Sequence, residues 1–248
     1  IRGGPGFLLS NALSVRGRAR LLLEPFVPPK RDDAPESMYD FGARRIGREA
    51  ADTLVSTMQL GIFGGDAKKL SLRHCFPRMA EMEREHGSLV KALLAKRRDA
   101  SSGGPAAPRG ELTSFPHGIG QLAETATEKV RPILRLGATI ESLRTDGDAF
   151  RVAIKGGDQV RSRSVIAALP ADSAAKVVAS MDADLSRKLD GIEYAPVTVV
   201  CTAYRRDKVG HDMNGFGFLV PRAEGKRVMG CIWTSTVFPQ SAPEGWVL

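Results

Sequence analysis

Apolar positions near the start of the chain recur at helical spacing between strong breaks. Residues 15–24 interleave arginines with leucines and stop at Pro25, which cannot continue a helix. Ser37 begins an S-x-x-D pattern typical of a helix N-terminus. Apolar residues then recur near helical spacing until the glycines of residues 61–65. These patterns predict one short helix and one long helix.

A further helix is expected to start at Pro77, because proline suits the first helical position, and Gly87 marks a break in it. Residues 99–110 read DASSGGPAAPRG, which predicts a loop or a domain linker. The chain before this segment is therefore expected to consist of helices separated by breaks.

The period changes after this segment. Residues 121–130 predict a short helix, and from residue 133 the pattern turns to strands, with Phe150, Val152 and Ile154 alternating with polar residues. Residues 165–169 form a continuous apolar run, as expected for a strand buried on both faces. Helices are expected at 171–180 and 185–192, and strands at 197–204, 217–220 and 228–234. The fold class predicted is mixed α/β.

The composition is that of a soluble globular protein. The 248 residues are 42% hydrophobic and 26% charged, which excludes disordered and collagen-like chains. No window approaches eighteen consecutive apolar residues, so a membrane-spanning helix is not expected and membrane contact would be peripheral.

The net charge of +8 is concentrated in the first half. Residues 1–110 hold 19 Lys and Arg against 12 Asp and Glu, whereas residues 111–248 hold 17 against 16. The basic residues cluster at 16–20, 44–48 and 96–98. Such clusters are compatible with nucleic acid, anionic lipid, an acidic substrate or solvent.

The three cysteines, Cys75, Cys201 and Cys231, are scattered and lack C-x-x-C spacing. This pattern favours a reducing compartment and buried structural thiols over disulfides or a zinc site. The chain starts at Ile1, as a fragment would, and shows no secretory signal. We expect a cytoplasmic protein.

Catalytic motifs are absent from the sequence. The four histidines have no metal-binding spacing, and there is neither a G-x-S-x-G elbow nor a P-loop. No metal site is predicted, and no side chain is assigned as an acid, base or nucleophile.

Two neighbouring segments depart from ordinary strand alternation: GFGFLVPR at 215–222 and MGCIWTSTVFPQSAPEG at 229–245. Glycine beside Phe216 permits a flat apolar ligand to approach the backbone, so the aromatic and aliphatic residues here are candidates for lining a slot. Packing inside a sheet core is the alternative.

Both segments resemble the substrate-domain signature of the protoporphyrinogen oxidase family. Residues 61–94, with GD-x-x-x-LS, FP and E-x-x-x-GS elements, resemble the family's helical domain, and SVIAALPA at 164–171 resembles a strand that returns to the flavin domain. The resemblance spans nearly the whole chain in family order.

It implies an FAD/NAD(P)-binding-like flavoprotein with an inserted helical domain. Residues 1–113 would form a helical membrane-associating domain, 114–170 an inserted piece of the FAD-binding domain, and 171–248 the first part of a mixed-sheet substrate domain. The basic first half would contact an anionic membrane surface, placing the protein peripherally at the inner face of the membrane. A homodimer is left open.

The resemblance also implies the chemistry. FAD would oxidise protoporphyrinogen IX to protoporphyrin IX, with molecular oxygen as the acceptor. Ile140 matches the aliphatic residue whose backbone meets FAD, while Phe216, Gly217, Leu219 and Ile232 match positions that sandwich the tetrapyrrole. The G-x-G-x-x-G motif that begins this family and the Gly-rich flavin motif that ends it do not occur here, so an incomplete FAD site and inactivity of the chain alone are expected.

Three alternatives stay open at this point. A sister flavoprotein, such as a coproporphyrinogen III-oxidising enzyme or a carotenoid desaturase, would share SVIAALPA. A nucleic-acid binder would explain the basic half, but aromatic residues do not interleave with its Lys and Arg, and no nucleic-acid partner is expected. The third alternative is a non-catalytic fragment that binds membrane through the basic half.

Overall fold

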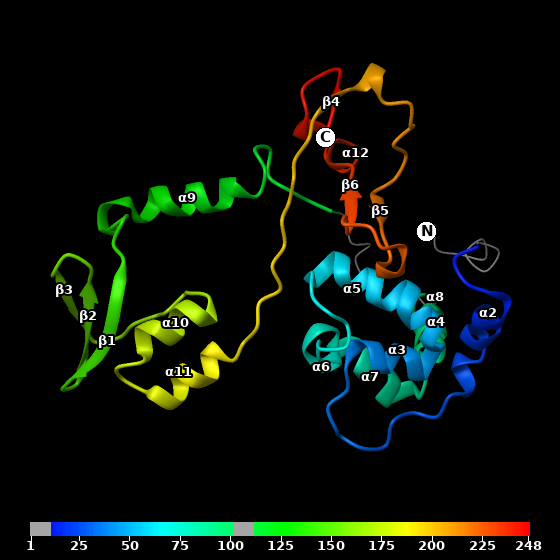
Figure 1. Ribbon diagram of the computed structural model, residues 1–248, viewed down its shortest axis with the longest axis horizontal. Helices are drawn as coiled ribbons and strands as arrows, with labels where there is room; N and C mark the ends of the chain where they lie inside the picture. The colour runs from blue at the N-terminus through cyan, green and yellow to red at the C-terminus, as the bar shows by residue number, and fades with distance from the viewer. Residues whose placement is uncertain (1–10, 102–111) are drawn as a thin grey trace. The chain divides into compact units, whose positions relative to one another are not determined.

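The computed structural model describes residues 11–101 and 112–248, and the chain divides into two compact units (Figure 1). The first unit comprises Ile1–Pro116 and Ala195–Leu248, and the second comprises His117–Tyr194. These units are groups of residues that pack together. The three functional domains, with boundaries near residues 113 and 170, stay a prediction.

The first unit begins with helices and short helical turns that follow the apolar pattern (Figure 1). Ser37 caps α3 (Met38–Ile46) as expected, since its Oγ accepts a hydrogen bond of 3.0 Å from the N–H of Asp40. The elements are α2 (Val15–Leu22), η1 (Glu24–Phe26), α3 (Met38–Ile46), α4 (Arg48–Ala50), η2 (Ala51–Val55), α5 (Ser56–Phe63), α6 (Leu72–Cys75), α7 (Pro77–His86) and α8 (Leu89–Ser101).

The long helix predicted after Ser37 is interrupted. Gly47 adopts a φ of 93°, which breaks the chain between α3 and α4, and the π-helical η2 then joins α4 to α5. Gly64, in the left-handed conformation, ends α5. Gly87 likewise separates α7 from α8, as predicted. The loop expected at 99–110 begins later than predicted, because α8 continues to Ser101, and the rest of it lies outside the described residues.

The core of the helices is a small apolar cluster. Met38, Phe41, Ala67 and Leu72 are buried together, and Phe76 packs against them. The packing holds α3 against α6 and the loop that precedes α6. Residues far apart in the sequence thus form one hydrophobic centre.

A buried ion pair joins the first helices to the last. Arg45 is fully buried and contacts Glu24, which is 1% exposed. The Glu24 carboxylate also accepts hydrogen bonds from Ser88 Oγ at 2.6 Å and from the N–H groups of Leu89 and Val90 at 2.9 and 3.2 Å. Glu24 therefore caps the N-terminus of α8, although it lies 64 residues earlier in the chain than Ser88.

A second carboxylate extends this network. Arg44 Nη1 donates to Glu83 Oε1 at 2.6 Å, Arg44 Nε donates to Glu36 Oε1 at 2.9 Å, and Arg45 Nη1 lies 3.1 Å from Glu83 Oε1. Burial would raise the pKa of Glu83, but the hydrogen bond and charge of Arg44 outweigh it and hold that pKa below its ordinary value. Arg44 and Arg45, two arginines of the 44–48 basic cluster, thus form internal ion pairs.

The C-terminal part of the first unit contains short antiparallel pairs. The strand predicted at 197–204 is wrong over most of its length, because only its last residue, Tyr204, is paired, and residues 197–203 are extended and exposed. The strands predicted at 217–220 and 228–234 form in shortened versions. The elements are β4 (Tyr204–Arg205), η4 (Arg206–Lys208), β5 (Gly217–Leu219), η5 (Arg222–Glu224), β6 (Gly230–Ile232), α12 (Thr234–Val237), η6 (Pro239–Ser241) and β7 (Trp246–Val247).

The second unit is a small α/β module (Figure 1). Its antiparallel sheet has the order β1-β2-β3, and α10 packs on β1 and against α11 around Leu143, Val177 and Val178. The elements are α9 (Gly120–Val130), η3 (Arg131–Ile133), β1 (Ile140–Asp146), β2 (Ala149–Ile154), β3 (Gln159–Ser162), α10 (Ala171–Val178) and α11 (Ala183–Asp190).

The buried strand predicted at 165–169 is wrong. These residues join no sheet, and Ile166 is 93% exposed. A strand buried on both faces needs neighbours that supply hydrogen bonds and cover its side chains, and no described strand pairs with this segment. The apolar side chains of residues 165–169 are therefore exposed in the structure.

Across residues 11–101 and 112–248, no helix is both long and apolar enough to cross a membrane.

Candidate functional site

The apolar hollow of the first unit is a groove of about 450 Å³. One wall is the end of α5, residues 60–64, and a second is the extended segment 197–202. The β5–β6 hairpin supplies Leu219 and residues 229–232. The volume is in the range of small-molecule sites.

Two glycines, Gly61 in α5 and Gly64 at its C-terminal end, determine how closely the walls approach. A Cβ on Gly61 would lie 2.7 Å from Leu219 Cδ2, and a Cβ on Gly64 would lie 2.4 Å from Val197 Cγ2. Both distances are below any normal carbon contact, so the hairpin and the extended segment pack directly on the α5 backbone. The glycines that ended the predicted helix thus also shape the groove, a role that was not predicted from their positions in the sequence.

The hairpin itself depends on Gly217. This residue pairs with Ile232, and its φ is 141°. A Cβ there would lie 2.0 Å from the carbonyl oxygen of Cys231. Only glycine allows the two strands to pair at this point, so Gly217 has a clear structural role whether or not it meets a ligand.

The four residues expected to sandwich a tetrapyrrole are close in sequence but differ in position. Leu219 and Ile232 line the groove, and Leu219 packs on Gly61 of α5, whereas Phe216 and Gly217 are not part of the lining. Phe216 is 55% exposed, and its carbonyl oxygen accepts a hydrogen bond from the N–H of Trp233. The structure therefore brings two of the four together with α5.

The expectation of buried cysteines is wrong for two of the three. Cys201 and Cys231 are exposed, and both line the groove. Cys75 is partly buried, and burial raises the pKa of its thiol. Apart from the two thiols, the groove lining contains only apolar residues, glycines and threonines. Such a surface can bind and orient an apolar molecule, but it holds no side-chain carboxylate, imidazole or ammonium for proton transfer.

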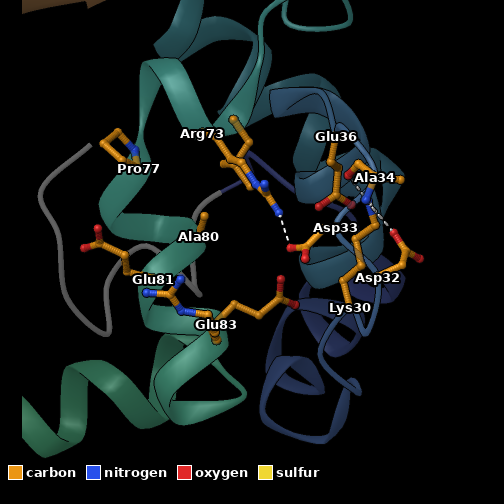
Figure 2. Close-up of a pocket in the computed structure, with 12 residues that line it drawn as sticks. Lys30, Asp32, Asp33, Ala34, Glu36, Arg73, Pro77, Ala80, Glu81 and Glu83 are labelled. Carbon is orange, nitrogen blue, oxygen red and sulfur yellow. Dashed lines mark hydrogen bonds and ion pairs between the residues drawn. The ribbon is translucent and has the colours of Figure 1, made fainter.

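A second hollow, of about 330 Å³, lies among charged residues of the helices (Figure 2). Arg73 bridges to Asp33 at 2.7 Å across it, and Glu36 and Glu83 line it while bonded to Arg44. None of the sequence-predicted site residues lines this hollow. Its charges are largely engaged in ion pairs that hold α3, α7 and the 30–36 segment together, so we treat it as structural.

Neither hollow carries a metal site: within the described ranges, no three His, Cys, Asp or Glu side chains are grouped to hold an ion.

Ile140, the residue expected to meet FAD, lies in the second unit. It is the first residue of β1, which is an edge strand of the sheet, and its side chain is half-buried. All strand pairs in the described part of the chain are antiparallel. A dinucleotide pyrophosphate is usually held where a parallel strand turns into a helix. The position of Ile140 on an edge strand is therefore compatible with a contact to FAD. The described residues contain no parallel strand that turns into a helix to hold the FAD phosphates.

Comparison with known proteins identifies the family. The family described as flavin containing amine oxidoreductase matches residues 3–248. This family binds FAD, so the family and the cofactor expected from the sequence are both confirmed.

The relatives include enzymes with two substrate names. The coproporphyrinogen III oxidase of Bacillus subtilis (strain 168) is 26% identical over 249 residues, covering 98% of this chain and 52% of the relative. The chloroplastic protoporphyrinogen oxidase of Oryza sativa subsp. japonica is 26% identical over 239 residues, covering 89% and 44%. The protoporphyrinogen oxidase of Bos taurus is 26% identical, covering 88% and 47%. The chain thus spans about half the length of the curated relatives it matches.

A crystal structure confirms the fold. The chain matches a candidate protoporphyrinogen oxidase from Exiguobacterium sp. 255-15 with a TM-score of 0.71 at 15% sequence identity, over 97% of this chain and 51% of that one. The mixed α/β class predicted from the sequence is therefore correct.

Proposed function

The chain belongs to the flavin containing amine oxidoreductases, and from this membership we propose that it forms the substrate-holding part of an enzyme that oxidises protoporphyrinogen IX to protoporphyrin IX, with molecular oxygen as acceptor. The observation that carries the proposal is the groove between α5 and the β5–β6 hairpin. It is apolar, it contains Leu219 and Ile232, and its volume suits part of a flat macrocycle.

The groove residues bind and orient rather than transfer protons. Leu219 and Ile232 of the hairpin, residues 60–64 and the 197–202 segment would together bound the part of the macrocycle that enters the groove. When bound, the flavin supplies the acceptor for the substrate's hydride, so the protein's task is to position the substrate and exclude water. The absence of charged groups from the groove lining fits this division of labour.

Phe216 and Gly217 are proposed to have different roles in substrate binding. Gly217 would act through the shape of the hairpin, since it permits the pairing that carries Ile232. Phe216 would contact an edge of the ligand that projects beyond the groove, because its ring is more than half exposed.

Ile140 is proposed to meet FAD through its backbone. It lies on an edge strand, so one side of that strand has no neighbouring strand in the described sheet. The flavin's phosphates would need other residues, as the antiparallel pairing shows no suitable cradle for them.

Coproporphyrinogen III is the second candidate substrate. The relative from Bacillus subtilis and one from Staphylococcus aureus (strain NCTC 8325 / PS 47) are both named coproporphyrinogen III oxidase, and each aligns over 98% of this chain. The identities, 26% and 25%, are similar to those of the protoporphyrinogen oxidases. The two substrates differ in the number of acidic side chains on one macrocycle, so the same groove suits both.

The test is a product assay on an enzyme that contains these 248 residues together with the flavin-binding motifs that do not occur in them. The protein is incubated with FAD and, separately, with each of the two porphyrinogens, and the fluorescence of the aromatic product is followed with and without oxygen. We expect oxygen-dependent formation of protoporphyrin IX. Oxidation of coproporphyrinogen III alone would assign the second substrate, and oxidation of neither, together with no binding of either porphyrin, would contradict both assignments.

We also propose that the helical half contacts an anionic membrane surface from the cytoplasmic side. Val15 and Leu22 are seven residues apart and lie on the same face of α2, where they are 77% and 60% exposed. Leu23 and Phe26 continue this apolar edge, and Phe26 is 82% exposed. Exposed Arg16 on the same helix adds positive charge. An apolar edge flanked by arginine suits the interface of a bilayer.

A further inference from the structure

Arg222 lies beside the groove without being part of its lining. It is the first residue of η5, three residues after Leu219, in the loop that joins β5 to β6. Its Nη2 is 3.5 Å from the carbonyl oxygen of Gly65. Gly65 follows Gly64, the residue that ends α5 and lines the groove. The side chain thus reaches from the hairpin loop to the loop after α5, just beyond the apolar lining.

The guanidinium keeps most of its hydrogen-bonding capacity. Its side chain is exposed, and in the part of the chain that the structure describes it has the contact with Gly65 and no ion pair. A contact of 3.5 Å is at the long limit for an N–H···O bond. Glu224, in the same short turn, forms no ion pair with it. Four further N–H groups of the guanidinium are therefore available to a ligand.

The cationic side chains near Arg222 have different contacts from those of Arg222. Lys68, in the loop after α5, has its Nζ 4.8 Å from the centre of the Tyr39 ring, so its charge is directed to an aromatic face. Lys226 and Arg227 lie further along the hairpin loop and have no described contact with the groove walls. The groove lining itself contains no charged side chain. Arg222 differs from these three residues in having a described contact with Gly65, the residue next to the groove wall.

We propose that Arg222 binds a propionate carboxylate of the tetrapyrrole whose apolar ring occupies the groove. The inference rests on the proposed function, because it takes the macrocycle as the groove's ligand. Porphyrinogens carry their carboxylates on the ring periphery, where a cation just outside an apolar groove can reach them. Arginine binds a carboxylate through two parallel N–H···O bonds, so Arg222 fixes which edge of the ring points out of the groove. Its role is binding and positioning, not catalysis.

The experiment compares an acidic porphyrin with its neutral ester. Purified full chain is titrated with protoporphyrin IX and with protoporphyrin IX dimethyl ester in the same detergent, and binding is followed by porphyrin absorbance. The variants are Arg222→Ala, Arg222→Lys and Arg227→Ala, the last as a control that removes the same charge from the same loop. Circular dichroism and thermal unfolding confirm that each variant is folded.

We expect Arg222→Ala to weaken binding of the diacid by about tenfold, the usual effect of losing a hydrogen-bonded charge partner, and to leave the ester within about twofold. Arg222→Lys should recover part of the loss, and Arg227→Ala should change little. Equal losses for Arg222→Ala and Arg227→Ala, or for diacid and ester, would overturn the assignment to Arg222. If the wild-type chain binds both porphyrins and Arg222→Ala has no effect, the inference fails while the proposed function stands. Binding of neither porphyrin would contradict both.

Discussion

At the scale of single residues, the groove depends on positions where a side chain would not fit. Gly217 pairs with Ile232 at a positive φ, and any Cβ there would overlap the backbone of Cys231. Gly61 lets Leu219 rest on the α5 backbone. A site built this way is sensitive to the addition of single methyl groups, even far from any reactive atom.

Gly217→Ala is expected to unpair the β5–β6 hairpin, because a Cβ 2.0 Å from the Cys231 oxygen cannot be accommodated without moving a strand. The matched control is Gly225→Ala in the same hairpin. Gly225 also has a positive φ, 61°, but open space around its Cβ, so only backbone strain of about 1 kcal/mol is expected there. Fluorescence of Trp233, which follows β6, reports the change. A spectrum and a melting temperature for Gly217→Ala equal to those of Gly225→Ala would contradict this view.

Leu219→Ala is expected to weaken porphyrin binding more than Phe216→Ala does, because Leu219 lines the groove and Phe216 does not. Loss of a well-buried leucine contact corresponds to about 1.5–3 kcal/mol, or roughly 10- to 150-fold in affinity. Both side chains are about half exposed in the free protein, so both variants should fold. Titration of both variants with protoporphyrin IX shows which substitution weakens binding more. The reverse order would place the ligand on the Phe216 side of the hairpin.

At the scale of elements, the helical half is held by charge as much as by apolar packing. Glu24 in η1 caps α8 and neutralises Arg45 of α3, and Arg44 joins α3 to Glu83 of α7. Four separate elements therefore meet at one buried network. Removing one partner leaves the others buried without compensation, which costs more than the ion pair itself contributes.

Glu24→Gln is expected to destabilise the helical half by about 3 kcal/mol, because buried Arg45 then loses one of its two carboxylate partners and α8 loses its charged cap. Glu85→Gln is the control, since Glu85 is an exposed residue of α7 and forms no described ion pair. Urea unfolding followed by circular dichroism measures the difference. A midpoint for Glu24→Gln within error of that for Glu85→Gln would show that the network contributes little.

The same network predicts the acid limit of stability. Burial raises the pKa of Glu24, but hydrogen bonds from Ser88, Arg45 and two backbone N–H groups outweigh it and lower the pKa below the ordinary value of 4.5. A carboxylate with a lowered pKa in the folded state stabilises the fold fully above the unfolded value, and this contribution is lost as the pH falls through the folded value. Wild-type stability should therefore decline below about pH 4.5.

Comparison with Glu24→Gln checks this, because the amide does not titrate. The stability difference between wild type and variant should be largest near neutral pH and shrink below about pH 4.5. A difference that stays constant from pH 7 to pH 3 would show that the charge of Glu24 is not what stabilises the helices.

At the scale of the whole molecule, local signals in the sequence were sufficient for most elements and insufficient for those that need distant partners. The Ser37 cap, the Gly87 break and the Pro77 start follow from residues within a few positions of each other, and all three form. Burial of residues 165–169 and pairing of 197–203 depend on strands elsewhere, and neither forms in the described part of the chain. An apolar run predicts a tendency to pair, not the presence of a partner.

In the candidate site, too, residues with a local sequence signal were predicted, and residues that depend on distant contacts were not. Leu219 and Ile232 were identified because their segment resembles a family signature, and the structure places both in the groove. The α5 wall and Arg222 were not identified, because their relation to the hairpin is a contact across more than 150 residues that no local pattern encodes. Arg44 and Arg45 are a case in which a local pattern suggested a surface that the fold does not form. Their spacing suggested a surface cluster, whereas folding brings Glu24, Glu36 and Glu83 to them.

The apolar edge of α2 and η1, formed by Val15, Leu22, Leu23 and Phe26, leads to the last prediction. Of the basic clusters in the first half, Arg44 and Arg45 are internally paired, and Arg20 donates to the carbonyl oxygens of both. The charge available for a membrane is thus smaller than the sequence suggested, and binding should rely on apolar insertion together with a few exposed cations such as Arg16.

We therefore expect the chain to sediment with vesicles that contain phosphatidylserine and to be only partly released by salt. Leu22→Ser combined with Phe26→Ser should weaken binding at all salt concentrations, since it removes the inserted side chains. Arg16→Ser should weaken binding about fivefold at low salt and much less at 0.5 M salt, because a well-placed cation contributes about 1 kcal/mol and is screened by ions. Leu185→Ser, on exposed α11 of the second unit, is the apolar control. If the double variant binds as the wild type does, or if the control loses as much affinity, the α2 edge is not the membrane contact.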